Sequence, residues 1–133
     1  MKLTRHKIRE VAFQTLFALA SEPDADRETI YRSLIELNDG EQVPEYLDFL
    51  VNGTVEHQDE LDKEISDHLA SGWTLQRLAK SDLIILRLAL FELQYENELP
   101  QAVAIDEALQ LAKTFSDDRS RKFINGVLSN FAK

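Results

Sequence analysis

The segment DLIILRLALFELQY, residues 82–95, constrains the fold of this chain more than any other stretch. Its apolar residues cover nearly the whole circumference of a helix, which predicts a helix buried on most sides. Arg87 interrupts the apolar run, and the run from Leu83 to Phe91 is less than half of the roughly 20 residues that a membrane span needs. We therefore expect a central core helix, capped by Ser81, with other helices packed around it.

The rest of the chain repeats apolar residues at helical spacing, and no stretch keeps the period of two that predicts a half-buried strand. A first helix should end near Ser21, and Asp26 should cap a short second helix that stops at Asn38–Gly40. Six or seven helices with short connections predict an all-α bundle, and 133 residues suffice for a single domain, 1–133. The remaining helices are expected in 44–72, which Gly53 should kink or divide, in 102–115, and from a cap at Asp117 or Asp118 through Phe131.

Charge is unevenly distributed along the chain. The net charge is −9, yet the first nine residues contain Lys2, Arg5, Lys7 and Arg9 and no acid. Between residues 36 and 67 there are eleven acids and one base. Because an acidic surface repels nucleic acid, any contact with RNA or DNA has to be confined to basic patches.

The composition also indicates a compartment. The chain has no cysteine, which excludes disulfides and thiolate metal sites and is compatible with a reducing environment. The positive residues at the start lead into an amphipathic pattern and not into the apolar core of a signal peptide. We expect a cytoplasmic protein without a membrane partner.

The first basic patch lies at the start of the first predicted helix, where cations are disfavoured by the helix dipole. On a helical wheel, His6, Arg9, Phe13 and Phe17 fall on the flank and far side of the apolar stripe that begins at Ile8. Cations neutralise phosphates and aromatic faces accept unstacked bases, a combination suited to single-stranded RNA. The alternative is that the two rings pack against a neighbouring helix while the basic residues are merely solvated.

A second basic patch lies in the first turn of the last predicted helix and also combines cations with an aromatic ring. Arg119, Arg121 and Lys122 stand before Phe123 in its first turn, again where anions are favoured. Gly126 would leave backbone accessible one turn later, although close helix packing explains it equally well. The two patches support one RNA site only if the fold brings them together into one electropositive pocket that carries aromatic rings.

Catalytic and metal-binding interpretations are poorly supported. The chain offers no cysteine nucleophile, no glycine-rich phosphate loop and no convincing Ser–His–Asp arrangement. Glu64 and His68 share one face of a predicted helix, with His57 nearly two turns earlier, but a solvated helix is the ordinary explanation of such spacing. We expect no enzymatic activity, no metal and no cofactor.

Several ordered strings together resemble the NusB family of transcription antitermination factors. They are RHKIREVAFQTLF at 5–17, ILRLALFEL at 85–93, Pro100, VAIDEALQLAKTF at 103–115 and KFINGVL at 122–128. The resemblance covers almost the entire chain. It implies two small helical sub-bundles that share a core.

The resemblance also implies a function and its partners. Members of the family bind the boxA element of nascent ribosomal RNA together with NusE, a small-subunit ribosomal protein. The complex joins RNA polymerase and other Nus factors and suppresses premature, Rho-dependent termination. Carried over by position, the RNA-binding residues are Arg5, His6, Lys7, Arg9, Lys122 and Phe123, and the NusE-binding residues are Asp82, Gln76 and Arg77. To the RNA-binding set we add Phe17 as a stacking face and Arg119 as a further cation.

This sequence departs from the family pattern at several of these positions. His6 and Lys7 stand where arginines are common, which makes this segment less strongly charged. Arg119, in contrast, adds a cation at a position that is usually acidic. Phe17 replaces a tyrosine, Asp106 an asparagine and Ser116 a glycine.

Two alternative functions remain. One is a helical protein-interaction scaffold whose cations meet an acidic protein. The other is an accessory RNA-binding module like the NusB-like domain of ribosomal RNA methyltransferases.

Overall fold

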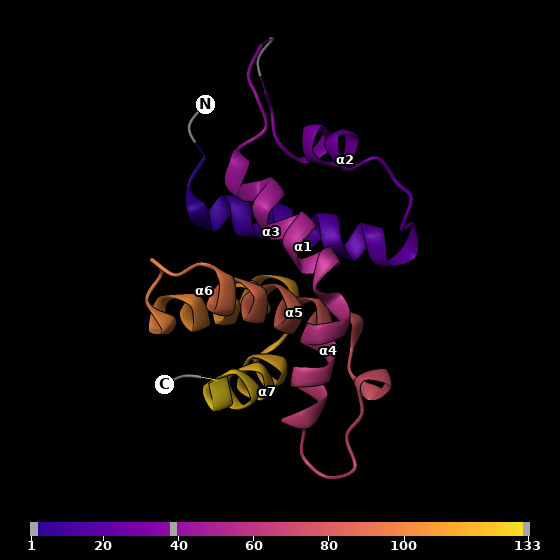
Figure 1. The fold of residues 1–133 in the computed structure, drawn as a ribbon, viewed down its shortest axis with the longest axis vertical. Helices are drawn as coiled ribbons and strands as arrows, with labels where there is room; N and C mark the ends of the chain where they lie inside the picture. Colours follow the sequence, from indigo (N-terminus) through magenta and orange to yellow (C-terminus); the bar gives the residue numbers. More distant parts are fainter. Residues whose placement is uncertain (1–2, 38–39, 132–133) are drawn as a thin grey trace.

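The structure is a computed structural model that describes residues 3–37 and 40–131. Its regular elements within these residues are all helical, which confirms the predicted all-α class. Figure 1 shows their arrangement. The α-helices are α1 (Arg5–Ser21), α2 (Arg27–Leu34), α3 (Glu45–Glu56), α4 (Gln58–Asp67), α5 (Lys80–Tyr95), α6 (Gln101–Phe115) and α7 (Asp118–Leu128), with 3-10 turns η1 (Leu75–Arg77) and η2 (Ser129–Phe131).

Helix α5 is the central helix, as its apolar circumference predicts. It packs against α1, α3, α4, α6 and α7, and Ile85, Leu86 and Leu90 are fully buried in its middle. The predicted cap at Ser81 is wrong, because the helix begins at Lys80 and its N-cap is Ala79. The carbonyl of Ala79 accepts the N–H of Leu83, which places Ser81 inside the first turn.

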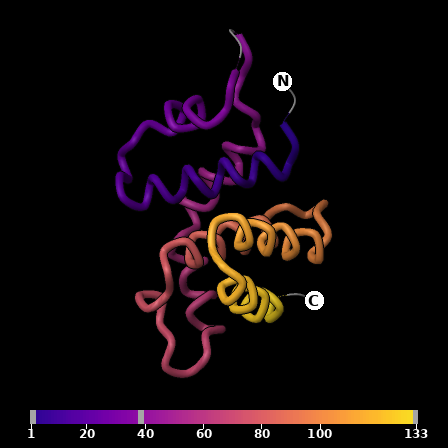
Figure 2. Tube along the Cα trace, turned by 180° about the vertical axis from the view of Figure 1, so that it is seen from behind, coloured from indigo at the N-terminus to yellow at the C-terminus, as the bar shows by residue number. Residues whose placement is uncertain are grey.

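Two sub-bundles meet at this helix. Helices α1 to α3 form one group and α4 to α7 the other, and one continuous core of buried side chains runs through both (Figure 1). Val11 and Leu50 come from the first group, and Leu61, Leu111 and Ile124 from the second. Seen from behind, α6 and α7 fold back on each other beneath α1 (Figure 2). The prediction of two sub-bundles with a shared core is confirmed.

Side-chain caps fix several helix starts where the sequence predicts them. The Asp26 carboxylate accepts the backbone N–H of Thr29, and that of Asp117 accepts the N–H of Ser120. Helix α2 ends at Leu34, earlier than the predicted stop at 38–40. Within that stop, Asn38 and Asp39 lie outside the described residues, and Gly40 takes a φ of 84°, which favours glycine.

Gly53 has a packing role that differs from the predicted one. The long pattern does divide into two helices, but at His57, which separates α3 from α4. Gly53 lies inside α3 against Phe91, and a Cβ at this position would overlap the Phe91 ring. The absence of a side chain therefore lets α3 approach α5 closely.

We expect Gly53→Ala to lower the free energy of unfolding by about 1–3 kcal/mol, because the added methyl group overpacks the α3–α5 contact. Urea denaturation followed by circular dichroism measures the change. Gly126→Ala is the matched control, since Gly126 lies within α7 with open space around its Cα. It should leave stability unchanged or raise it by about 0.5–1 kcal/mol. Equal stability of the two variants would contradict the overpacking.

Candidate nucleic-acid interface

The first basic patch occupies the opening turn of α1. Thr4 caps the helix by accepting the Lys7 backbone N–H at 3.0 Å, and the side chains of Arg5 and Lys7 are exposed. The Arg5 guanidinium lies 3.5 Å from the centroid of the Tyr46 ring on α3, a cation–π contact that orients it. Lys2 lies outside the described residues. The patch thus presents two cations: Arg5 is held against the Tyr46 ring, and Lys7 lies in the capped first turn of α1.

Arg9 does not belong to this exposed surface, and the prediction that it does is wrong. Its side chain is 4 % exposed, and its Nε donates to both carboxylate oxygens of Glu92 on α5, at 2.9 and 3.0 Å. The Tyr46 hydroxyl donates to the same carboxylate. Burial disfavours the charged guanidinium, but the hydrogen bond and charge of Glu92 outweigh it and raise the pKa of Arg9. Arg9 instead anchors α1 to α5, and Glu92 also holds the tyrosine that supports Arg5.

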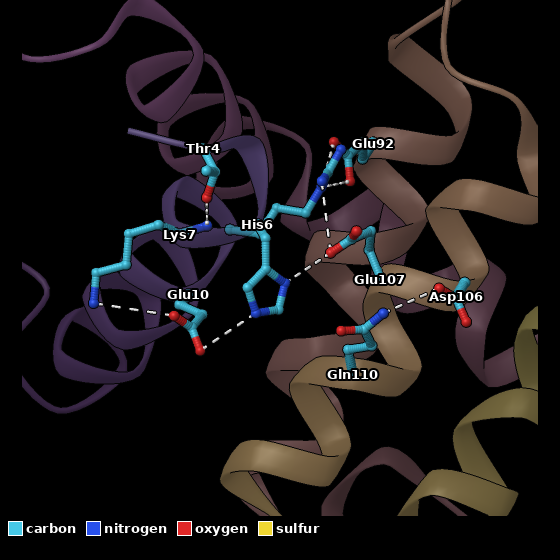
Figure 3. Close-up of polar contacts among 9 residues, drawn as sticks. Thr4, His6, Lys7, Glu10, Glu92, Asp106, Glu107 and Gln110 are labelled. Atoms are coloured by element: carbon cyan, nitrogen blue, oxygen red, sulfur yellow. Dashed lines mark hydrogen bonds and ion pairs between the residues drawn. The ribbon is translucent and has the colours of Figure 1, made fainter. Parts of the chain in front are cut away.

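Carboxylates flank the patch and partly neutralise it (Figure 3). His6 Nδ1 lies 3.0 Å from a Glu107 oxygen on α6, and its Nε2 lies 3.7 Å from Glu10. The Lys7 ammonium is 4.0 Å from Glu10. A phosphate would compete with Glu10 for the Lys7 ammonium. The sequence analysis did not predict that these two acids flank the patch. The contact of Glu10 could have been predicted, because it follows His6 by four residues on the same helix. That of Glu107 could not, because the residue is distant in the sequence.

The two aromatic residues of α1 have different environments. Phe13 is buried and stacks on Phe115, with ring centroids 4.6 Å apart, so the alternative of helix packing holds for this ring. Phe17 is 40 % exposed, as RNA stacking requires. The Lys80 ammonium lies 4.2 Å from the centroid of the Phe17 ring and donates to the Ser21 hydroxyl. Lys80 is a further cation beside an accessible ring that the sequence did not single out.

The second basic patch lies in the first turns of α7. Arg121 and Lys122 pair with Asp118 at 2.7 and 3.5 Å. The hydrogen bond and charge of Arg121, followed by the charge of Lys122, lower the pKa of the Asp118 carboxyl. Arg119 is exposed and forms no ion pair with any residue in the described part of the chain. Phe123 is half-buried beside Trp73, with ring centroids 6.2 Å apart.

The two patches do not form one pocket, and that prediction is wrong. The first turns of α1 are fixed near the end of α5 by the Arg9–Glu92 contact, whereas the first turn of α7 is fixed near the start of α5, where Ser120 donates to Asp82. Ten residues of α-helix separate these two acids, which corresponds to about 15 Å along α5. Lys7 and Phe17 of α1 are exposed and bridge part of this distance. A single-stranded nucleic acid in an extended conformation is long enough to contact both patches. A ligand much smaller than the distance of about 15 Å between them contacts only one.

The predicted partner-binding residues lie near the second patch. Gln76 and Arg77 are exposed on η1. Asp82 is only 8 % exposed, and its two oxygens accept hydrogen bonds from the hydroxyls of Ser116 and Ser120 at 3.2 and 3.0 Å. The Asp82 carboxylate therefore holds the α6–α7 corner against α5 and leaves little surface for a partner.

The histidines weighed as metal ligands bond to the backbone. His57 Nδ1 lies 2.9 Å from the Gly53 carbonyl oxygen, and His68 Nδ1 lies 2.8 Å from that of Glu64. Within residues 3–37 and 40–131, no group of three or more metal-ligating side chains is clustered. None of the helices described there combines the length and apolar character needed to cross a bilayer.

These features define an all-helical protein whose acidic body carries separate patches of accessible cations and aromatic rings, the combination found in proteins that bind single-stranded RNA. The sequence model of the NusB family matches residues 6–133. The chain belongs to the NusB family. It is 62 % identical over 133 residues to the transcription antitermination protein NusB of Limosilactobacillus reuteri, covering 100 % of this chain and 96 % of that protein. The corresponding protein of Lactiplantibacillus plantarum is 54 % identical over 135 residues, covering 100 % and 97 %.

Solved structures of the family have the same fold. NusB of T. maritima superposes with a TM-score of 0.85 at 34 % identity, covering 99 % of this chain and 92 % of that one. A chain from a crystal structure of the antitermination factors NusB and NusE in complex with double-stranded RNA gives a TM-score of 0.78 at 26 % identity, covering 95 % and 93 %. The fold inferred from the sequence resemblance is thus confirmed.

Proposed function

We propose that this protein is a transcription antitermination factor that binds the boxA element of nascent ribosomal RNA together with NusE and suppresses premature, Rho-dependent termination. The observation that carries the proposal is the full-length match to antitermination proteins named NusB, at up to 62 % identity. The fold is also that of a chain crystallised with NusE and RNA. RNA polymerase and the other Nus factors are the further partners that the family resemblance implies.

RNA is held by few cations in this proposal. Arg5 and Lys7 contact phosphates at the start of α1, and Arg119 and Lys122 do so at α7. Phe17 and Phe123 offer stacking faces. The RNA strand runs along α1 past Lys7 and Phe17, from one patch to the other. About four phosphate contacts give a modest affinity for RNA alone that falls steeply with salt.

NusE extends this limited surface. Gln76 and Arg77 are exposed and lie beside the second patch, so a partner seated there would also contact the RNA strand. Asp82 is 8 % exposed and adds little to that contact. We propose that the protein works as one RNA-binding domain, residues 1–133, without a cofactor. It acts by binding in the cytoplasm and not by catalysis.

A fluorescence anisotropy titration tests the function. A labelled 12-nucleotide boxA RNA is titrated with the protein, with and without NusE, at two salt concentrations. We expect weak binding to the protein alone at low salt, loss of that binding at high salt, and tighter binding when NusE is present. No RNA binding at low salt, with or without NusE, would contradict the function and favour the protein-interaction scaffold.

Removing a competing carboxylate should strengthen RNA binding. We expect Glu10→Gln to raise the affinity for boxA RNA about 2- to 5-fold, because it releases the Lys7 ammonium from a partly exposed ion pair. The same anisotropy titration measures the gain. Glu28→Gln is the control, since it removes one negative charge and breaks the exposed pair with Arg32 on α2. An equal gain in both variants would mean that only net charge matters.

A further inference from the structure

Trp73 is the only tryptophan of the chain, and 46 % of it is exposed. It precedes η1 and forms one wall of a cavity of about 280 Å³ between this turn and α7. Arg77, Arg119 and Phe123 also line the cavity. A tryptophan is a large apolar side chain that folding usually covers, and this ring remains half uncovered beside an open cavity.

The rings of the cavity are arranged as a stacking platform. The Trp73 and Phe123 rings lie with their centroids 6.2 Å apart and their planes inclined at 41°. They are therefore neighbours and do not cover each other as stacked rings would. Trp73 lies in the loop before η1, which packs against α4, and Phe123 lies on α7, which Asp82 of α5 holds through Ser120. The platform is therefore built from two separate segments of the chain.

Two cations and two carboxylates line the cavity, and they differ in how far they are engaged. The Arg77 guanidinium lies 5.2 Å from the Trp73 ring centroid and donates to the Gly72 carbonyl, and Arg119 forms no ion pair within residues 3–37 and 40–131. Two acids also line the cavity, but both are engaged. Asp82 accepts from two serine hydroxyls, and Asp117 accepts the Ser120 N–H at 2.8 Å. Arg119 is thus available to a ligand, and Arg77 keeps further N–H donors beyond the one given to Gly72, whereas the carboxylates are occupied in holding α7.

We propose that this cavity binds one unstacked base of the RNA. The base stacks on the exposed face of Trp73 with its edge toward Phe123, and Arg77 and Arg119 receive the phosphates on either side. A protein segment would also cover an exposed tryptophan, but the two cations favour a nucleic acid. This site rests on the proposed function and specifies where a base would bind. It combines Phe123, which the sequence assigned to RNA, with Arg77, which the sequence assigned to a protein partner.

The intrinsic fluorescence of Trp73 tests the site directly, because no other tryptophan contributes. Binding of the 12-nucleotide boxA RNA at low salt should quench the emission, since a stacked base contacts the indole. A 12-unit abasic ribose-phosphate chain carries the same charges without bases and should bind more weakly with little quenching. Unchanged emission at an RNA concentration that saturates the anisotropy signal would overturn the site.

Substitutions separate stacking from charge. We expect Trp73→Ala to weaken RNA binding about 10-fold or more and Trp73→Phe to restore it to within about 3-fold of the parent. The slope of log affinity against log salt should stay unchanged in Trp73→Ala and fall by about 0.7 in Arg119→Ala. Tyr95→Ala is the matched control, because Tyr95 is a 40 % exposed ring near the other end of α5 and should not affect binding. Circular dichroism verifies that each variant is folded.

Two results would overturn the site while leaving the proposed function intact. One is parent-like RNA affinity in Trp73→Ala. The other is emission that responds to NusE alone and not to RNA, which would make the cavity a protein interface. Failure of the proposed function is distinguishable, because then the unmodified protein gives no anisotropy change with boxA RNA, with or without NusE.

Discussion

Replacing Glu92 by alanine lowers the free energy of unfolding by about 3–5 kcal/mol, the largest effect on stability that we expect from a single substitution in this chain. Glu92 is 2 % exposed and accepts both of the hydrogen bonds that Arg9 Nε directs to α5. Its removal leaves the Arg9 guanidinium buried, and within residues 3–37 and 40–131 the remaining carboxylate paired with it is that of Glu107, at 3.7 Å. Urea denaturation monitored by circular dichroism measures the loss.

A double variant shows whether the pair or the buried charge is responsible. Arg9→Met combined with Glu92→Leu removes both charges and keeps apolar volume, so it should be considerably more stable than Glu92→Ala alone. A loss below about 1 kcal/mol in Glu92→Ala would mean that water reaches Arg9 and that the pair is not isolated from solvent.

Replacing Arg5 and Lys7 together by alanine has the largest expected effect on RNA binding. Two fewer phosphate contacts lower the slope of log affinity against log salt by about 1.4, which corresponds to about 25-fold in affinity at 0.1 M salt. Both side chains are exposed, so the fold should be retained. Anisotropy titrations with boxA RNA at several salt concentrations give the slope.

The control for this variant keeps the same net charge. Arg32→Ala combined with Lys63→Ala also removes two exposed cations, but from α2 and α4. It should leave the salt slope unchanged if the start of α1 is the phosphate-binding segment. Arg9 is excluded from the test because its replacement would disturb the core and mix a loss of folding with a loss of binding.

The candidate site could be predicted only in part. The resemblance located Arg5, Lys7 and Phe17, and the structure leaves all three exposed. It did not reveal Trp73, although a single tryptophan in a polar turn, followed four residues later by Arg77, was a signal that the sequence contained. Nothing local indicated that Glu107 lies beside His6, because the two residues are 101 positions apart.

The sequence by itself determined the helices and the central place of α5. Helical periodicity and capping are local properties, so Asp26 and Asp117 mark helix starts without reference to the rest of the fold. An apolar circumference requires burial wherever the helix is placed, which made α5 the core helix before its neighbours were known.

Only the tertiary structure decided which charges and rings face solvent. A helical wheel gives the direction of a side chain but not what packs against it. The wheel therefore placed Arg9 and Phe13 outside the core, whereas in the structure Arg9 is covered by α5 and Phe13 by α6. The Arg9–Glu92 pair joins residues 83 positions apart, and the separation of the two basic patches follows from the antiparallel packing of α1 on α5. Charge pairing and burial depend on distances between elements, and these distances are set by the packing of the whole core.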